Sequence, residues 1–474
     1  MVSPSPAPRR RRAVIRAVVY GSLAAVVVAF AVFVLLRDRP FRPQESERWI
    51  QTDYARLPEV RLLQRYVQID TSPTTGDEVA GARFLADRLA EAGIPSHLER
   101  LDGKHANLWA VLEGKSPEAV VLHNHIDVTP VDPKEWFSPP YEARIQLPWI
   151  YGRGVFDMKS VAIAQLQALI ALKKSGVQPA RSVIFLGTGG EEYGSFLGTR
   201  WILAQHPELV KRFWAVLTEG GTVEARTRGD VKYWGTEFAQ KRFADLIVCG
   251  SDLQRLQELR EVVQKEGHSA VTGLTLLPEV RTFLQGYAPS RDRQDLRDLF
   301  AHPDRVLSDI AAFRKLPAYV QSMFRNEAVP FALHEALGGG YELDIKFHLL
   351  PGVELAQVRD QLVPPWMTHG LTTLLVEPPT SRHGSPPDHP VMAAIHDAVL
   401  ARHPGAGVGP MFLAWTATDS RFYRAAGIPS YGFSPFLIMN TDTFQVDAAN
   451  ERMALPAFVD GIHLYADVLR RLTH

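Results

Sequence analysis

Residues 119–127, AVVLHNHID, join a run of aliphatic side chains to polar groups at its carboxyl end. A short apolar run rich in valine and leucine predicts a buried strand. In open α/β sheets, ligands bind in the crevice beyond the carboxyl ends of the strands. Side chains two residues apart on a strand share a face. We therefore expect His125 and Asp127 to point together into such a crevice.

Three other segments place carboxylates after strand-like or glycine-rich stretches. Asp157 lies in YGRGVFDMKS, Glu191 and Glu192 follow SVIFLGTGG, and Glu219 follows FWAVLT. Taken singly, each has an ordinary explanation, such as a polar strand end, a helix N-cap or a solvated acidic face. Gathered in one crevice, they would repel one another unless a cation lay between them. The pattern predicts a divalent metal site, where one adjacent glutamate can bind the ion and the other act as general base.

The composition is that of a globular protein without a nucleic-acid partner. The chain has 474 residues, of which 46% are hydrophobic and 22% charged, which allows two or three domains. Lys+Arg and Asp+Glu both total 52, so no basic excess exists to neutralise phosphates. The single cysteine, Cys249, excludes a disulfide framework and a zinc site built from several thiolates.

The N-terminal segment differs in kind from the rest of the chain. Residues 13–36, AVIRAVVYGSLAAVVVAFAVFVLL, are about as long as a membrane-spanning helix requires. Arginines occupy positions 9–12, so the positive-inside rule predicts a cytoplasmic basic tail at 1–12 and an extracytoplasmic body. A cleaved signal peptide is the alternative, but the apolar segment is long and no clean A-x-A site follows it. We therefore expect a single-pass membrane protein with an uncleaved N-terminal anchor.

The pattern of predicted secondary structure changes twice after a polar linker at 37–55. Strand-like and helix-like segments first alternate, which predicts a mixed sheet flanked by helices. From about 229 the segments suit a small α+β domain, with an alternating strand at 341–350 and a helix after it. After this domain, strand-like and helix-like segments alternate again. We predict an α/β domain in two parts, residues 56–228 and 376–474, interrupted by an inserted α+β domain at residues 229–375.

The motifs HNHIDV, YGRGVFDMKS, GGEEYGS and TEGG together resemble those of the M20 family of dinuclear zinc peptidases and amidohydrolases. Within that family, the pattern resembles that of carboxypeptidase S and the related N-acyl amino-acid hydrolases. The resemblance extends from about residue 60 to the C-terminus and includes FHLLPGVELAQV, ATDSRFYRAAGIPSYGF and NERM. It implies a catalytic α/β domain with an inserted lid domain, which often mediates homodimer formation. It also implies hydrolysis of peptide or N-acyl amino-acid amide bonds with two divalent ions, zinc in the family.

The resemblance assigns a role to each residue named above. Glu191 would be the general base that takes a proton from the attacking water. The Asp157–Met158 peptide bond would be cis. The remaining roles would be His125 and Glu219 on the first ion, Glu192 on the second, Asp157 bridging both, and Asp127 orienting His125.

Three positions depart from the family pattern. Asp447, in QVDAANERM, stands where the family has its last metal ligand, a histidine. An all-oxygen second site would favour Mn²⁺ or Mg²⁺ relative to zinc, or bind its ion weakly. His348 replaces the lid arginine that binds the substrate carboxylate, which leaves Arg421 as the other cationic candidate. The lid histidine of a Gly-His-Ser segment is missing after the first lid strand, and His268 lies in a later Gly-His-Ser.

The sequence thus predicts a membrane-anchored, metal-dependent hydrolase of small peptides or N-acyl amino acids. Retention of Glu191 favours an enzyme, because a scaffold has no use for a general base beside a metal ligand. Two alternatives stay open. One is a catalytically impaired family member that acts as an extracytoplasmic binding or scaffold protein, and the other is a hydrolase with a single metal ion.

Overall fold

A computed structural model describes residues 53–474 except 228–229, 268–272, 337–338, 378–382 and 440–444. The expected basic tail at 1–12, the membrane helix at 13–36 and most of the linker therefore lie outside the described residues. Within them, Val155–Lys174 has the length and mean hydropathy (1.4) of a membrane span, but it is 72% buried in the protein. Its hydrophobicity is that of a core helix.

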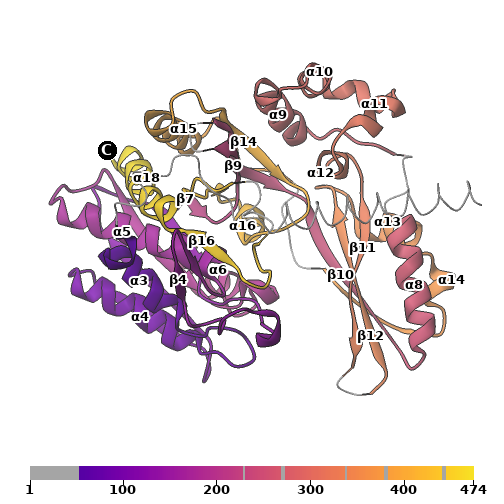
Figure 1. The fold of residues 1–474 in the computed structure, drawn as a ribbon, viewed down its shortest axis with the longest axis horizontal. Coiled ribbons are helices and arrows are strands. Elements are labelled where there is room, and N and C mark those ends of the chain that lie inside the picture. The colour runs from indigo at the N-terminus through magenta and orange to yellow at the C-terminus, as the bar shows by residue number, and fades with distance from the viewer. Residues whose placement is uncertain (1–52, 228–229, 268–272, 337–338, 378–382, 440–444) are drawn as a thin grey trace, which may run out of the picture. The chain divides into compact units, whose positions relative to one another are not determined.

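Among the described residues, nine strands form a large sheet of mixed direction (Figure 1). β3 (Ser116–His125) runs parallel to both neighbours, β6 (Arg181–Thr188) and β7 (Phe213–Thr218). The mixed sheet expected from the sequence is therefore confirmed. Its order is β1-β2-β6-β3-β7-β15-β9-β14, with β8 beside β9, and the remaining strands are β1 (Ser96–Arg100), β2 (Ala106–Leu112), β8 (Thr222–Thr227), β9 (Asp230–Gln240), β14 (Val408–Leu413) and β15 (Ser430–Gly432).

Helices cover both faces of the large sheet, which explains why its central strands are continuously apolar. Val120 and Leu122 of β3 belong to the core on one face, and Ala119 and Val121 belong to the core on the other. The first core is closed by α3 (Pro58–Val67), α4 (Glu78–Glu91), α5 (Ser160–Lys174), α15 (Pro390–Arg402) and α18 (Leu455–Thr473), and the second by α6 (Thr199–Gln205) and α16 (Ser420–Ala425).

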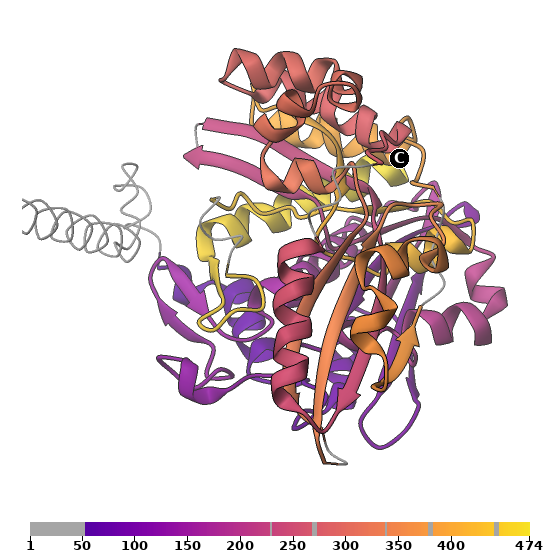
Figure 2. The ribbon, with the colours of Figure 1, turned by 90° about the vertical axis from the view of Figure 1, so that its right-hand side faces the viewer.

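Figures 1 and 2 show a second, smaller sheet. Its buried apolar residues form a core of their own. Its four strands are antiparallel, in the order β11-β12-β10-β13. Alternate residues of β10, such as Leu246 and Val248, are buried against the helix α8. The elements are β10 (Arg242–Gly250), α8 (Leu253–Glu266), β11 (Glu327–Glu335), β12 (Tyr341–Leu349), α13 (Leu355–Leu362), α14 (Pro365–Thr368) and β13 (Thr372–Val376).

The small sheet takes only part of the segment that we expected to form the inserted domain, residues 229–375. β9, at its start, pairs with β14 and β15 in the large sheet. Between α8 and β11, a group of helices buries Phe283, Phe313 and other apolar residues in the core of the large sheet. This packing could not be anticipated, because amphipathic helices do not reveal which sheet they cover. These helices are α9 (Pro278–Tyr287), α10 (Gln294–Ala301), α11 (Ile310–Lys315) and α12 (Ala318–Ser322).

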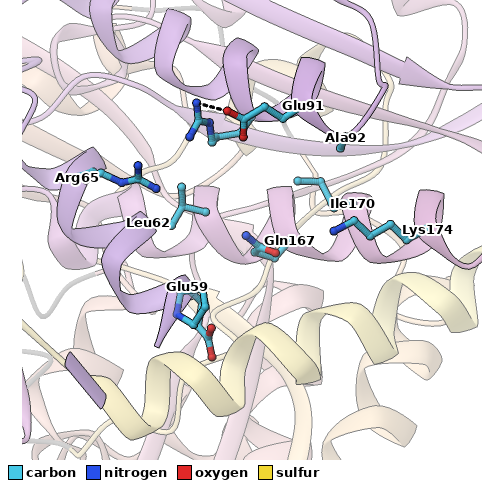
Figure 3. Close-up of a pocket in the computed structure, with 10 residues that line it drawn as sticks. Glu59, Leu62, Arg65, Glu91, Ala92, Gln167, Ile170 and Lys174 are labelled. Carbon is cyan, nitrogen blue, oxygen red and sulfur yellow. Dashed lines mark ion pairs between the residues drawn. The ribbon is translucent and has the colours of Figure 1, made fainter. Parts of the chain in front are cut away.

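A hollow of about 400 Å³ opens between α3, α4 and α5, and five of its ten lining residues are charged (Figure 3). Arg88 and Glu91 form an ion pair of 2.6 Å there, and Arg65 and Lys174 extend into the same region. The hollow contains none of the carboxylates that follow the strand ends.

Candidate metal centre

His125 ends β3, and its imidazole is fixed at the carboxyl edge of the large sheet. Its Nδ1 lies 2.9 Å from the main-chain carbonyl oxygen of Asp127. A carbonyl oxygen can only accept, so Nδ1 donates in this bond. Nε2 faces two carboxylates, at 3.0 Å from Asp157 Oδ1 and 3.6 Å from Glu219 Oε2. This is the orientation of a metal-binding histidine whose second nitrogen is held by the protein.

Asp127 is fully buried, and its carboxylate binds the turn that carries the two adjacent glutamates. Oδ1 accepts the N–H of Glu191 and Oδ2 accepts the N–H of Glu192, both at 3.0 Å. The carboxylate also lies 3.6 Å from His125 Nδ1. The contact expected to orient His125 is therefore made mainly by the carbonyl of Asp127. Its carboxylate fixes the Glu191–Tyr193 turn against the end of β3, which the sequence did not indicate.

Asp157 lies in a segment whose main chain is held by a buried glutamate. Its bond to Met158 is cis, as the family resemblance implied. β16 (Arg452–Ala454) pairs with β5 (Trp149–Tyr151) and so brings Glu451 beside this segment. The Glu451 carboxylate accepts four hydrogen bonds, from Arg153 Nη1 (2.8 Å) and the main-chain N–H groups of Gly154 (3.0 Å), Phe156 (2.7 Å) and Asp157 (3.1 Å).

Glu191 follows Gly190, whose left-handed φ of +73° lets the chain turn sharply after β6. Its side chain is only 9% exposed. Burial, together with the nearby charge of Asp419, raises the pKa of Glu191 to about 8, and Arg421 opposes this shift. Arg421 Nη2 lies 3.9 Å from Glu191 Oε1. A buried carboxyl with a raised pKa is the form in which a glutamate can accept and return a proton near neutral pH.

The remaining acids gather around His125 closely enough to share cations. Among the described residues, ligand atoms lie within 4.8 Å of one another in two groups, His125 with Asp157 and Glu192, and His125 with Glu191 and Glu219. Tetrahedral ligands at about 2.0–2.1 Å from zinc are roughly 3.3 Å apart, close to the measured distances from His125 Nε2. The residues present therefore fit a divalent ion.

The electrostatics of this cluster also favour a bound cation. Burial and the charge of Asp157 raise the pKa values of Glu192 and Glu219 well above the ordinary range. Burial alone would lower the pKa of His125, but Glu219 and the bonds to Asp127 and Asp157 raise it well above its usual value. Glu192 Oε1 is buried without a hydrogen-bond partner among the described residues. A cation would compensate these buried carboxylates.

Asp447 lies beside the cluster, but its carboxylate contacts Thr129 and Arg153. Thr129 Oγ1 donates to Asp447 Oδ1 at 2.9 Å, and Arg153 Nη1 lies 3.6 Å from the same oxygen. Burial and the charge of Asp157 raise the pKa of Asp447 to about 6, which shows that its carboxylate interacts electrostatically with the cluster. It belongs to neither group of close ligand atoms among the described residues. Its role as a metal ligand stays a prediction.

The two described candidates for substrate binding, Arg421 and His348, lie on different elements. Arg421, on α16, lies beside Glu191, and its Nε is buried without a hydrogen-bond partner among the residues described. His348 lies on β12 of the small sheet, opposite Phe243 of β10 and Glu327 of β11, and its ring centroid is 4.6 Å from that of Phe243. His268 falls outside the described residues.

Two residues of the site had no role assigned from the sequence. Glu451, in the quoted NERM motif, holds the segment of Asp157. Asp419, in the quoted ATDSRFY motif, is 1% exposed, accepts a hydrogen bond from Ser195 Oγ and faces His123 at 3.8 Å. Both motifs were part of the family resemblance. The hydrogen bonds that Glu451 and Asp419 make to distant segments could not be predicted from the sequence.

Comparison with known proteins places this geometry in a family. Residues 121–471 match the family model for peptidase family M20/M25/M40. Aminoacylase-1 of Sus scrofa is 23% identical over 427 residues, covering 88% of this chain and 95% of its own length. Two solved structures share the fold with a TM-score of 0.65, and this chain covers nearly all of each. One is the M20 family metallo-carboxypeptidase Sso-CP2 from Sulfolobus solfataricus, which is 16% identical and aligns with 87% of this chain and 99% of its own. The other is human carnosine dipeptidase 1, which is 14% identical and aligns with 87% of this chain and 96% of its own. The chain therefore belongs to peptidase family M20/M25/M40 and is a hydrolytic enzyme of the metallocarboxypeptidase and amidohydrolase type.

Proposed function

We propose that this protein hydrolyses the amide bond of small peptides or N-acyl amino acids. The observation that carries the proposal is the pairing of Glu191 with the His125 cluster, because Asp127 holds both adjacent glutamates by their main-chain N–H groups. A buried base beside a cluster of metal-binding groups is what amide hydrolysis requires. Aminoacylase-1 and carnosine dipeptidase 1 are relatives whose names point to such substrates.

In this proposal, His125, Asp157, Glu192 and Glu219 hold two divalent ions, and Asp447 contributes to the second. We propose zinc, with Mn²⁺ or Mg²⁺ as the alternative for the second, oxygen-rich site. The ions would polarise the scissile carbonyl and acidify the attacking water. Glu191 takes the proton from that water and returns it to the leaving amine. Arg421 lies where it can bind the carboxylate of the substrate, and the small sheet acts as a lid.

The proposed test measures metal content and turnover together. Purified protein should bind up to two divalent ions per chain and hydrolyse members of a panel of dipeptides and N-acyl amino acids. Glu191→Gln should retain its metal and fold but lose at least about 10²-fold in kcat, because the general base is gone. Glu118→Gln, at an exposed acid near Arg181, is the matched control and should keep full activity.

Absence of turnover at full metal loading, unchanged by Glu191→Gln, would instead support a binding or scaffold protein. Turnover at one ion per chain would support the single-metal alternative.

We further propose that residues 13–36 anchor the protein in a membrane with the catalytic part outside the cytoplasm. The support is the apolar length of the segment and the arginines at 9–12. Cys249 is the single cysteine and is partly exposed. A membrane-impermeant maleimide should label it in intact cells, and Cys249→Ser should abolish the signal. Labelling only after lysis would contradict this topology and place the catalytic part in the cytoplasm.

A homodimer through the small sheet is also proposed. β13 is an edge strand, and it exposes Leu374 (57%) and Leu375 (40%). Exposed apolar side chains on an edge strand favour pairing with another chain. Light scattering after size exclusion should give a dimer that Leu374→Lys weakens, whereas a monomeric wild type would contradict the proposal.

A further inference from the structure

A cavity of about 570 Å³ lies between the helices α9, α10 and α12 and the edge of the large sheet formed by β8, β9 and β14. It runs from the surface to the interior, because Trp415 is 50% exposed while Val223 and Phe300 are each 1% exposed. Its lining is predominantly aromatic and aliphatic, and includes Phe283, Phe300, Val320, Met411, Leu413 and Trp415.

The charged and phenolic groups of the lining bond to one another or to the main chain. Glu224 accepts hydrogen bonds from both Tyr287 and Arg291. Tyr233 and Tyr319 donate their hydroxyl groups to main-chain carbonyls, at 2.7 and 2.8 Å. The tyrosines therefore offer their rings to the cavity, and Arg291 is already neutralised. Such a lining accepts an apolar group and disfavours a charged one.

Two segments connect this cavity to the carboxylates of the metal centre. Thr222 lines the cavity three residues after Glu219, and Thr416 lines it three residues before Asp419. Three residues span at most about 11 Å of extended chain. The second connection is fixed, because the Gln240 side chain accepts from Thr418 N at 3.0 Å and donates to Thr418 O at 3.1 Å. Each segment therefore keeps part of the cavity lining within about 11 Å of Glu219 or Asp419 along the main chain, a span that an extended acyl chain can cover.

We infer that this cavity binds the acyl chain of a medium- or long-chain N-acyl amino acid, an assignment that rests on the proposed amide hydrolysis. The carboxylate side of such a substrate requires a cation, which Arg421 offers beside Glu191. A cavity of about 150 Å³ accommodates one benzene ring, so 570 Å³ is far more than an acetyl group needs. The acyl side is the apolar part of the substrate and matches this lining.

The test is a series of N-acyl derivatives of one amino acid, with acetyl, hexanoyl and decanoyl groups. The value of kcat/KM should rise with chain length, by up to about fourfold for each buried methylene. A value that is flat or falls from acetyl to decanoyl would overturn the inference.

Two substitutions locate the effect in the cavity. Val320→Trp fills it, and Trp415→Ala removes an aromatic wall at its exposed end, where the fold tolerates change better. Each should lower the ratio of decanoyl to acetyl kcat/KM at least tenfold. Trp366→Ala, at a tryptophan that is 72% exposed on α14, is the matched control and should leave the ratio unchanged. An unchanged ratio in folded Trp415→Ala and Val320→Trp would contradict the assignment.

Binding separates this inference from the proposed function. If no derivative is hydrolysed, the amidohydrolase proposal fails, and the cavity is tested by calorimetric titration of Glu191→Gln. N-decanoyl ligand should then bind at least tenfold more tightly than N-acetyl ligand, and Val320→Trp should remove the difference. Equal affinities would reject the cavity as an acyl site.

Discussion

Asp127 shows at the scale of one residue how the site is held together. Its carbonyl oxygen fixes the His125 imidazole, and its two carboxylate oxygens fix the main chain of Glu191 and Glu192. Three oxygen atoms of a single residue thus position the candidate base and two candidate ligands. The geometry requires two acceptor oxygens on the side chain, which only a carboxylate of this length supplies.

We predict that Asp127→Asn lowers kcat by about 10- to 100-fold, the range for lost outer-shell support of a metal site. An asparagine accepts with one oxygen and directs an NH₂ group at the second N–H, so the turn must shift. Steady-state kinetics with metal analysis checks this. Asp77→Asn is the control, since Asp77 caps α4 through Ala80 N and asparagine caps equally well. Equal activity of both variants would refute the role of Asp127.

Asp447 is the residue at which this chain departs most from the family pattern. Its φ of +56° is in the left-handed region, which aspartate and histidine tolerate better than most residues. Its carboxylate bonds to Thr129 rather than to the close ligand groups.

We predict that Asp447→His strengthens zinc binding at the second site. An imidazole is a better zinc ligand than a carboxylate in an oxygen-rich set, and it reaches further than the aspartate side chain. Competition with a chelator should show at least a tenfold gain in zinc affinity. An affinity equal to that of the wild type would count against Asp447 as a position of the metal site.

At the scale of elements, parallel strands bring the functional groups to one edge of the sheet. β6, β3 and β7 end near one another, and His123 of β3 bridges them through Thr188 and Thr218, each at 2.9 Å. Full burial and the nearby His125 lower the pKa of His123 to about 3. The strand ends are thus joined by a neutral imidazole.

This predicts that the contribution of His123 to the stability of the fold decreases in acid. The unfolded chain binds a proton at His123 below pH 6.5, whereas the folded chain does not until about pH 3. The contribution of His123 to the free energy of unfolding therefore falls by about 1.4 kcal/mol per pH unit in that window, or roughly 2 kcal/mol from pH 7 to 5. On going from pH 7 to pH 5 in chelator, the free energy of unfolding measured with urea should change by about 2 kcal/mol less favourably in the wild type than in His123→Gln. His463→Gln, at an exposed histidine of α18, should behave as the wild type.

At the scale of the molecule, the crowded carboxylates oppose folding unless a cation is present. Glu192 and Glu219 are held in raised-pKa environments on separate strand ends of the same sheet. Bound ions therefore stabilise the whole α/β body, because they join segments far apart in the sequence.

We predict that removal of metal by a chelator lowers the thermal midpoint by several degrees. A site filled at 100 times its Kd adds about 2.7 kcal/mol to the free energy of unfolding. Calorimetry with and without added zinc measures the shift. Glu219→Gln should reduce it and Glu118→Gln should not. A midpoint independent of metal would show that these acids bind no ion.

The local patterns of the sequence were sufficient for the central strands and for the acids that follow them. An apolar run buried on both faces and a glycine turn after it are encoded by neighbouring residues, so His125, Asp157, Glu191 and Glu219 could be placed at one edge. The bounds of the inserted domain stay a prediction, because local patterns do not show that β9 and the helices α9–α12 pack on the large sheet although they lie within residues 229–375.

Contacts between distant segments were decided only by the tertiary structure. Glu451 reaches Asp157 because β16 pairs with β5, and the apolar cavity exists because α9–α12 cover β9 and β14. Neither pairing leaves a periodic signal, since hydrophobic spacing specifies which face is buried but not the partner that buries it. Strand ends and their acids follow from local chemistry, whereas the support of Asp157 and the room for an acyl chain follow from packing.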